Sequence, residues 1–92
     1  MLKAEVFVGL KPVVNDPAGS TILGGLHALG FDQVRQVRSG KYLVLLLDED
    51  DDVKARAMVT EMAQKLLANA VIEDFTIEIS RVREPVPAAD SR

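Results

Sequence analysis

Residues 2–11 read LKAEVFVGLK, and the rest of the fold can be built outward from this stretch. Apolar side chains occupy every even position, and the odd positions are mostly polar or glycine. Successive side chains of a β-strand point to opposite faces, so this period of two predicts a strand with one buried face. Phe7 is the exception, because it places an aromatic ring on the polar side.

A helix is expected after this strand. Asp16 can accept hydrogen bonds from the first free backbone amides, and Pro17 suits the first helical position. Gly30 can adopt the positive φ that ends a helix. Gly24 and Gly25 either permit a close backbone approach or mark a weak helix. Between these signals, apolar residues recur at helical spacing, at Ile22, Leu23, Leu26 and Leu29.

Two more strands are expected next. Residues 31–38 carry two valines among polar side chains, a composition typical of an edge strand. Ser39 and Gly40 would allow a tight reversal. The strand expected at residues 41–47 is apolar on both faces, which predicts a central position in the sheet.

Five consecutive acidic residues, 48–52, precede an amphipathic stretch. Carboxylates are favoured at helix N-termini, where they cap free amides and interact with the helix dipole, so this run predicts a helix start rather than a metal site. A calcium loop would also need a glycine and a later glutamate at set positions, and the run lacks both. The helix is expected to end at Asn69 and to bury Ala55, Met58, Val59, Met62, Ala63 and Leu66.

The last strand is expected at residues 71–82, where apolar and polar side chains alternate. Residues 84–92 contain two prolines and little apolar bulk, so we expect a disordered tail after a single domain at 1–83. The order β-α-β-β-α-β predicts an α+β, ferredoxin-like fold. Its antiparallel sheet would have four strands, with two helices on one face.

Composition excludes several classes of function. The 92 residues include 11 basic and 14 acidic side chains, which argues against nucleic-acid or anionic-membrane binding. The chain has no cysteine and one histidine, His27, which excludes thiol catalysis and a multi-histidine metal site within one chain. Phosphate-loop and dinucleotide motifs are also missing. We therefore expect no catalytic, cofactor-binding or metal-binding residues, and the lack of a signal peptide predicts a cytoplasmic protein.

A sheet with both helices on one side leaves its other face bare. The strand at 41–47 must place there either its leucine triplet or Tyr42, Val44 and Leu46, and Phe7 can lie beside them. Such an apolar patch indicates a contact surface, so a homodimer or homotetramer is expected. The alternative is that the chain folds over its own second face.

Three motifs together resemble one known family. They are DPxG at residues 16–19, VRxGKY at 37–42 and KLLANxVIEDF at 65–75. No single motif is decisive, but their order and spacing over residues 2–80 resemble PurS, the small subunit of phosphoribosylformylglycinamidine synthase. The resemblance implies a PurS-like fold.

The resemblance also implies a non-catalytic subunit of a ligase complex in de novo purine synthesis. That complex converts formylglycinamide ribonucleotide, ATP and glutamine to the amidine. Its PurL subunit holds ATP and magnesium, its PurQ subunit is the glutaminase, and PurS bridges the two and supports ammonia transfer. The candidate subunit contacts in this chain are Arg38, Gly40, Lys41, Tyr42, Val44, Leu46 and Asn69.

Two other functions are compatible with parts of the pattern. A ferredoxin-like dimeric regulatory module could bind a small metabolite at its interface, using Gly24 and Gly25 or the bare sheet. RNA binding on the sheet would need exposed aromatic residues and basic charge, and the chain offers few aromatic residues and a net charge of −3.

Overall fold

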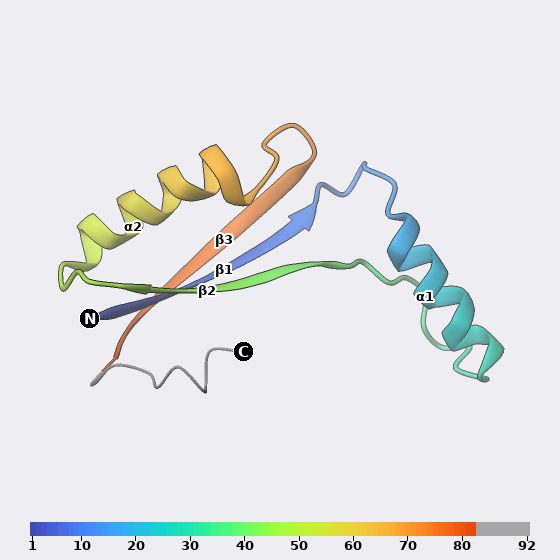
Figure 1. Cartoon of the computed structure of the whole chain (residues 1–92). Helices are drawn as coiled ribbons and strands as arrows, with labels where there is room; N and C mark the ends of the chain where they lie inside the picture. The colour runs from blue at the N-terminus through green and yellow to red at the C-terminus, as the bar shows by residue number, and fades with distance from the viewer. Residues whose placement is uncertain (83–92) are drawn as a thin grey trace.

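The computed structural model describes residues 1–82, and the tail expected at 84–92 lies outside them. The boundary expected at residue 83 therefore stays a prediction. The fold class is α+β, as expected, but the sheet has three strands (Figure 1). In chain order the elements are β1 (Leu2–Leu10), α1 (Pro17–Ala28), β2 (Gly40–Leu47), α2 (Asp52–Met62), the π-helical turn η1 (Ala63–Leu67) and β3 (Glu73–Arg81).

The sheet has the strand order β2-β1-β3, and both pairs of strands are antiparallel. Val6, at the middle of β1, pairs with Leu43 of β2 and with Ile77 of β3. β1 is therefore the central strand. The prediction that β2 is central was wrong, because β2 has one neighbour when no strand forms at residues 31–38.

Residues 31–38 form no strand, and they run from α1 to β2 as an irregular segment (Figure 1). The Ser39 amide donates to Asp16 Oδ2 at 2.7 Å, and Gly40 pairs with Gly9 of β1. These two residues therefore lead the chain into β2 instead of reversing it. A strand needs a neighbour to complete its backbone hydrogen bonds, and the local sequence pattern does not show whether one is present.

α2 packs on one face of the sheet, against β1 and β3. Ala55 and Val59 of α2 and Ala63 of η1 are buried, as expected. Met58 and Leu66, expected in the same stripe, are 40% and 83% exposed. The narrow line of contact between a helix and a sheet leaves these flanking side chains free. The buried core consists of Leu2, Ala4, Val6, Val8, Leu47, Ala55, Val59, Ala63 and Ala68.

The end of the second helix differs from the expectation. α2 continues into η1, where the Ala68 amide donates to the Ala63 carbonyl at 2.9 Å. Ala68 is extended, with φ −131° and ψ 147°, and no non-glycine residue among 1–82 has a positive φ. The left-handed helix end predicted at Asn69 was therefore wrong, because the wider π-helical turn ends the helix before that residue.

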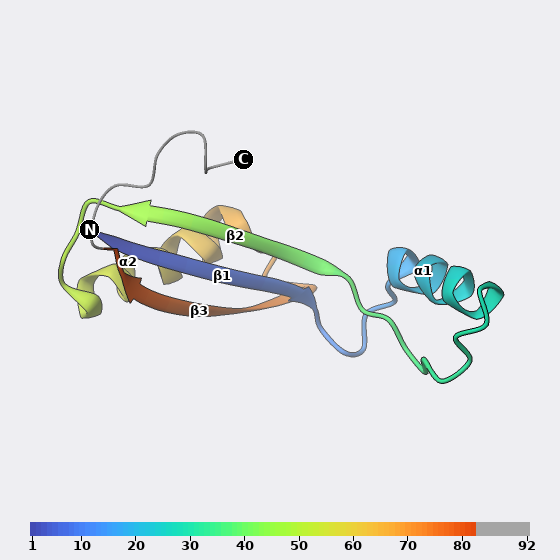
Figure 2. The ribbon, with the colours of Figure 1, turned by 90° about the horizontal axis from the view of Figure 1, so that it is seen from below.

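α1 lies beyond the end of the sheet and not on its face (Figures 1 and 2). The prediction of two helices on one face thus holds for α2 and fails for α1. The local signals were read correctly, since Asp16 accepts the Gly19 amide at 2.9 Å and Gly30 has φ 97°. A Cβ on Gly19 would lie 2.1 Å from the Val37 carbonyl oxygen, so α1 packs closely against its own return segment instead of the sheet.

Candidate subunit interface

The face of the sheet opposite α2 carries a cluster of exposed apolar side chains, and Figure 2 looks onto this face. Phe7, Tyr42, Val44 and Leu46 are 39%, 57%, 49% and 41% exposed. We call these four residues the open face. A contiguous apolar patch on a small protein marks a contact surface. Tyr42, Val44 and Leu46, all predicted as contacts, therefore lie together.

An aromatic pair forms the centre of the open face. Phe7 and Tyr42 are opposite each other in the β1–β2 register, with ring centroids 5.1 Å apart and planes tilted by 32°. The Tyr42 hydroxyl donates to Glu5 Oε2 at 2.5 Å. This hydrogen bond to the carboxylate is the main reason that the pKa of Tyr42 is raised. The Tyr42 side chain is therefore held at both its ring and its hydroxyl.

On the same face of the sheet, the part toward β3 is polar. Glu5 pairs in register with Glu78, and Phe7 with Thr76. Like charges directly opposite each other on neighbouring strands destabilise a sheet, so the two carboxylates favour a partner that brings a cation or a hydrogen-bond donor. The surface thus joins an apolar half over β1 and β2 to an acidic half over β3.

Arg38 and Gly40 lie where the chain returns from α1 to the sheet. Arg38 Nη2 donates to the carbonyl oxygens of Lys11 at 3.0 Å and Val14 at 2.8 Å. A Cβ on Gly40 would lie 2.3 Å from the Val8 carbonyl oxygen. Arg38 therefore holds backbone segments of its own chain together, and the missing side chain of Gly40 leaves room for the backbone of β1. Their role as subunit contacts stays a prediction.

Lys41 and Asn69 lie near each other at the α2 side of the sheet. Lys41 Nζ donates to the Leu67 carbonyl at 2.8 Å and is 3.8 Å from Glu73 Oε1. Asn69 Oδ1 accepts the Val71 amide at 3.0 Å, and the Asn69 amide donates to Glu73 Oε1 at 2.6 Å. These bonds organise the turn that leads into β3. The seven predicted contacts are therefore divided between two faces and one end of the sheet.

A shallow hollow of about 550 Å³ lies at the end of the sheet where the chain returns from α1 to β2. Arg38 is its one arginine, and its guanidinium is already used on the two backbone carbonyls described above. His27 is exposed on α1, where its Nε2 lies 2.7 Å from the Val34 carbonyl oxygen. The hollow also contains the Ser39 hydroxyl and Lys41, but no carboxylate or histidine lines it. The Lys41 ammonium is already used on the Leu67 carbonyl.

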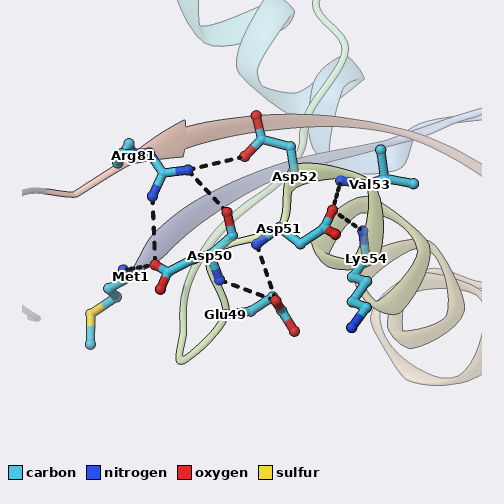
Figure 3. A network of polar contacts seen from close by, with 8 residues as sticks. All are labelled: Met1, Glu49, Asp50, Asp51, Asp52, Val53, Lys54 and Arg81. Atoms are coloured by element: carbon cyan, nitrogen blue, oxygen red, sulfur yellow. Dashed lines mark hydrogen bonds and ion pairs between the residues drawn. The ribbon is translucent and has the colours of Figure 1, made fainter.

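The acidic run at 48–52 is used for structure, as Figure 3 shows. Asp51 caps α2 by accepting the amides of Val53 and Lys54, which confirms the capping interpretation. Asp50 binds the N-terminal ammonium at 2.6 Å and Arg81 at 3.5 Å. The hydrogen bond from the ammonium lowers the pKa of Asp50. Residues 1–82 contain no group of three or more His, Cys, Asp or Glu side chains arranged to hold a metal ion.

Two functional features escaped the sequence reasoning. Glu5 fixes Tyr42 by accepting a hydrogen bond from its hydroxyl, and the two residues lie on neighbouring strands 37 positions apart in sequence. Asp16 was expected as a helix cap, but its carboxylate also binds the amide and hydroxyl of Ser39. No local pattern connects residues 23 positions apart, so this second role could not be predicted.

The fold and the site define a class of small α+β domains in which a helix covers one face of the sheet and the other face is open and apolar. Comparison with known proteins identifies the family. The profile described as "PurS: Phosphoribosylformylglycinamidine (FGAM) synthase" matches residues 3–81, and the chain belongs to the PurS family.

Curated relatives agree with this assignment. The chain is 43% identical over 82 residues to phosphoribosylformylglycinamidine synthase subunit PurS of Synechocystis sp., covering 89% of this chain and 82% of the relative. It is also 43% identical over 82 residues to PurS of Bacillus subtilis, covering 89% of this chain and 96% of the relative.

Solved structures agree as well. PurS of Methanocaldococcus jannaschii superposes with a TM-score of 0.82 at 38% identity, covering 90% of this chain and all of that one. A chain of PurLQS from Thermotoga maritima superposes with a TM-score of 0.77 at 27% identity, covering 87% of this chain and 99% of that one. These findings do not favour the alternative of a metabolite-binding regulatory module. No helix among residues 1–82 is long and apolar enough to cross a bilayer.

Proposed function

We propose that this chain is the non-catalytic PurS subunit that joins the PurL synthetase to the PurQ glutaminase in phosphoribosylformylglycinamidine synthase. The observation that carries the proposal is the match over residues 3–81, together with the similarity to a chain of PurLQS from Thermotoga maritima. ATP and magnesium bind to PurL in this proposal, and glutamine is hydrolysed on PurQ. The location is cytoplasmic, where this step of purine synthesis takes place.

The open face supports a role in contact. Its four side chains expose apolar surface that a chain of this size would bury in an assembly. We propose that a second copy of the chain covers this face, in a homodimer or a homotetramer. The remaining predicted contacts are left for PurL and PurQ: Arg38 and Gly40 at the end of the sheet, and Lys41 and Asn69 on its α2 side.

The physical contribution of such a subunit is geometric. Ammonia made on one subunit must reach a second active site before it escapes or is protonated in bulk water. Holding two sites in fixed register replaces a diffusive encounter by a local one, which raises the effective concentration of the second reactant. A rigid three-stranded sheet with no chemistry of its own is sufficient for this task.

Reconstitution tests the proposal. PurL and PurQ of the same organism are mixed with and without this chain, and amidine formation is measured with glutamine and, separately, with ammonium chloride. We expect the chain to raise the glutamine-dependent rate at least about tenfold, because tethering acts on the transfer between subunits. The ammonium-dependent rate should change much less, since it bypasses PurQ.

The control is the chain unfolded by heat before mixing, which should restore the rate of PurL and PurQ alone. An equal glutamine-dependent rate with and without the folded chain would contradict the bridging role.

A further inference from the structure

Two glycines lie side by side on the face of the sheet opposite α2. Gly9 of β1 pairs in register with Gly40 of β2 and, on its other side, with Asp74 of β3. Side chains two residues apart in a strand point to the same face, so this row lies on the face that carries Phe7 and Tyr42. Beside the aromatic pair, the sheet therefore presents bare backbone.

Two hollows meet over this row of residues, at the end of the sheet nearest α1 (Figure 2). The hollow toward β2 has a volume of about 550 Å³, and the hollow toward β3 has a volume of about 320 Å³. Both are lined by Phe7, Gly9, Leu10 and Pro12, and we call the two together the glycine trough. Neighbouring strands lie about 4.8 Å apart, so the trough crosses roughly 10 Å of sheet, the length of about three residues of extended chain.

The fold itself does not require glycine at position 9. A Cβ on Gly9 would meet no atom within 4 Å, and the positive φ found among residues 1–82 is that of Gly30. Glycine weakens a strand because it packs no side chain, and it often marks a place where a ligand or another backbone comes close. Nothing within residues 1–82 fills the space over Gly9, so this space suits a segment of another molecule.

Arg38 supplies a cation at the β2 end of the glycine trough. Its two hydrogen bonds within residues 1–82 both leave from Nη2, so the donors on Nη1 and Nε remain for a ligand. Arg38 is exposed and belongs to none of the ion pairs in this part of the chain. The buried Asp16 carboxylate is used on the amides of Gly19 and Ser39, and no carboxylate lines this hollow. The β2 end therefore favours a ligand that brings a carboxylate.

The β3 end of the trough has the opposite character. The Asp74 carboxylate is paired with Lys11 Nζ at 2.7 Å, and the Asp74 side chain is still 65% exposed. Phe7 and Pro12 line the trough between its two ends. A bound segment therefore has one favoured direction across the sheet, with its acidic residue toward β2 and an apolar residue in the middle.

We propose that the glycine trough binds an extended segment of a partner subunit, with an apolar side chain over Gly9 and a carboxylate on Arg38. The inference rests on the proposed function, and it names the chemistry by which PurL or PurQ is recognised at this end of the sheet. The shape favours a protein segment over a metabolite, because small-molecule sites enclose most of their ligand and this trough is shallow. The difference in charge between the two ends gives the contact its specificity.

Filling the glycine trough tests the proposal. Gly9→Val places a side chain over the floor of the trough, where a Cβ meets no atom. The measured quantity is the concentration of each variant that gives half of the maximal glutamine-dependent rate with fixed PurL and PurQ. We expect Gly9→Val to raise this concentration at least about tenfold, because it excludes the bound segment. The matched control is Ser80→Val, an exposed residue on the same face at the far end of β3, and it should have no effect.

A second pair of variants tests the carboxylate. Gln36 lines the β2 hollow together with Arg38, and Gln33 of the same segment does not. Gln36→Glu adds a negative charge to the hollow and should raise the half-maximal concentration several-fold at low salt, with a smaller effect as salt screens the charge. Gln36→Lys should lower it. Gln33→Glu makes the same change of charge outside the trough and should leave it unchanged.

Equal half-maximal concentrations for the wild type, Gly9→Val and Gln36→Glu would overturn the proposal and leave the proposed function standing. Weaker self-association of these variants in sedimentation would assign the trough to a second copy and would also overturn it. A wild-type chain that does not raise the rate at all would contradict the proposed function, and this inference with it. Urea unfolding shows whether Gly9→Val is folded, and Gln36→Glu tests the proposal without that variant.

Discussion

Among single residues, Asp16 fixes more of the shape of this chain than any local pattern indicates. Its carboxylate accepts the amides of Gly19 and Ser39 and the hydroxyl of Ser39, and the residue is buried. One side chain therefore caps α1 and connects it to the start of β2. The amide of Gly19 is the main reason that the pKa of Asp16 is lowered, followed by the amide of Ser39.

Acid should destabilise the protein through Asp16. In the unfolded chain its carboxyl titrates near 3.8, and in the folded chain it titrates lower. The stabilisation is therefore complete above the ordinary pKa and is lost as the pH falls through the folded-state value. Asp50 acts in the same direction through the N-terminal ammonium. Urea unfolding between about pH 5 and pH 3 should show this loss.

Asp16→Asn is the matched variant for that experiment. It keeps the shape of the side chain but cannot titrate, so it should be less stable than the wild type at neutral pH and show a shallower dependence on acid. The same acid dependence in both proteins would contradict the role of Asp16.

Gly9 and Gly40 face each other across β1 and β2, and they should respond differently to alanine. A Cβ on Gly40 would lie 2.3 Å from the Val8 carbonyl oxygen, whereas a Cβ on Gly9 would meet no atom within 4 Å. Gly40→Ala should therefore cost about 1–3 kcal/mol of unfolding free energy, as forced contacts in packed regions do. Gly9→Ala is the control and should be near neutral in urea unfolding. Equal losses would show that Gly40 is not closely packed.

Among the elements, β2 supplies most of the open face, and a charge there should interfere with association. Val44→Asp and Leu46→Asp each place a carboxylate in the apolar cluster and should shift sedimentation toward the monomer by at least about tenfold in dissociation constant. Val13→Asp is the matched control, because Val13 is 93% exposed in the segment between β1 and α1. An unchanged profile for both variants of β2 would mean that the open face is not a contact between copies.

Most helices and strands could be predicted because their signals are local. The alternation in β1, the cap at Asp16 and the acidic start of α2 each depend on residues close in sequence. The strand expected at 31–38 failed for a different reason, since a strand exists only where a neighbour pairs with it. The same limit explains the misplaced α1 and the exposed Met58, because packing partners are set by the chain as a whole.

The candidate site was predicted in part for the same reason. Tyr42, Val44 and Leu46 share a face by the period of two alone, so the sequence was sufficient to group them. Arg38 and Lys41 were grouped with them only by closeness in sequence. In the structure both side chains bind carbonyl oxygens of their own chain, which depends on contacts between residues 24 to 27 positions apart.

As a whole, the molecule is elongated, with extents of 47 × 32 × 18 Å. The reason is that α1 stands beyond the sheet (Figures 1 and 2), while the core lies between α2 and the three strands. No residue of α1 belongs to that core. The hydrophobic core and the position of α1 are therefore held by different sets of contacts.

Removal of α1 should leave a folded remainder. β1 and β2 are antiparallel neighbours with Gly9 opposite Gly40, so Leu10 and Ser39 can be joined by an Asn-Gly turn in place of residues 11–38. We expect the shortened chain to unfold in one cooperative transition in urea, because the residues of the core are all retained. The same deletion with Val59→Asp is the control and should not fold. A non-cooperative transition in the shortened chain itself would show that α1 contributes to the core.

Topologically, then, residues 11–38 are an insertion at the tip of a β-hairpin. Natural variation or protein engineering could lengthen, trim or replace such an arm without redesigning the hydrophobic interior, just as a loop graft leaves its scaffold intact. The quaternary arrangement of this small protein could in that way diverge faster than its tertiary fold.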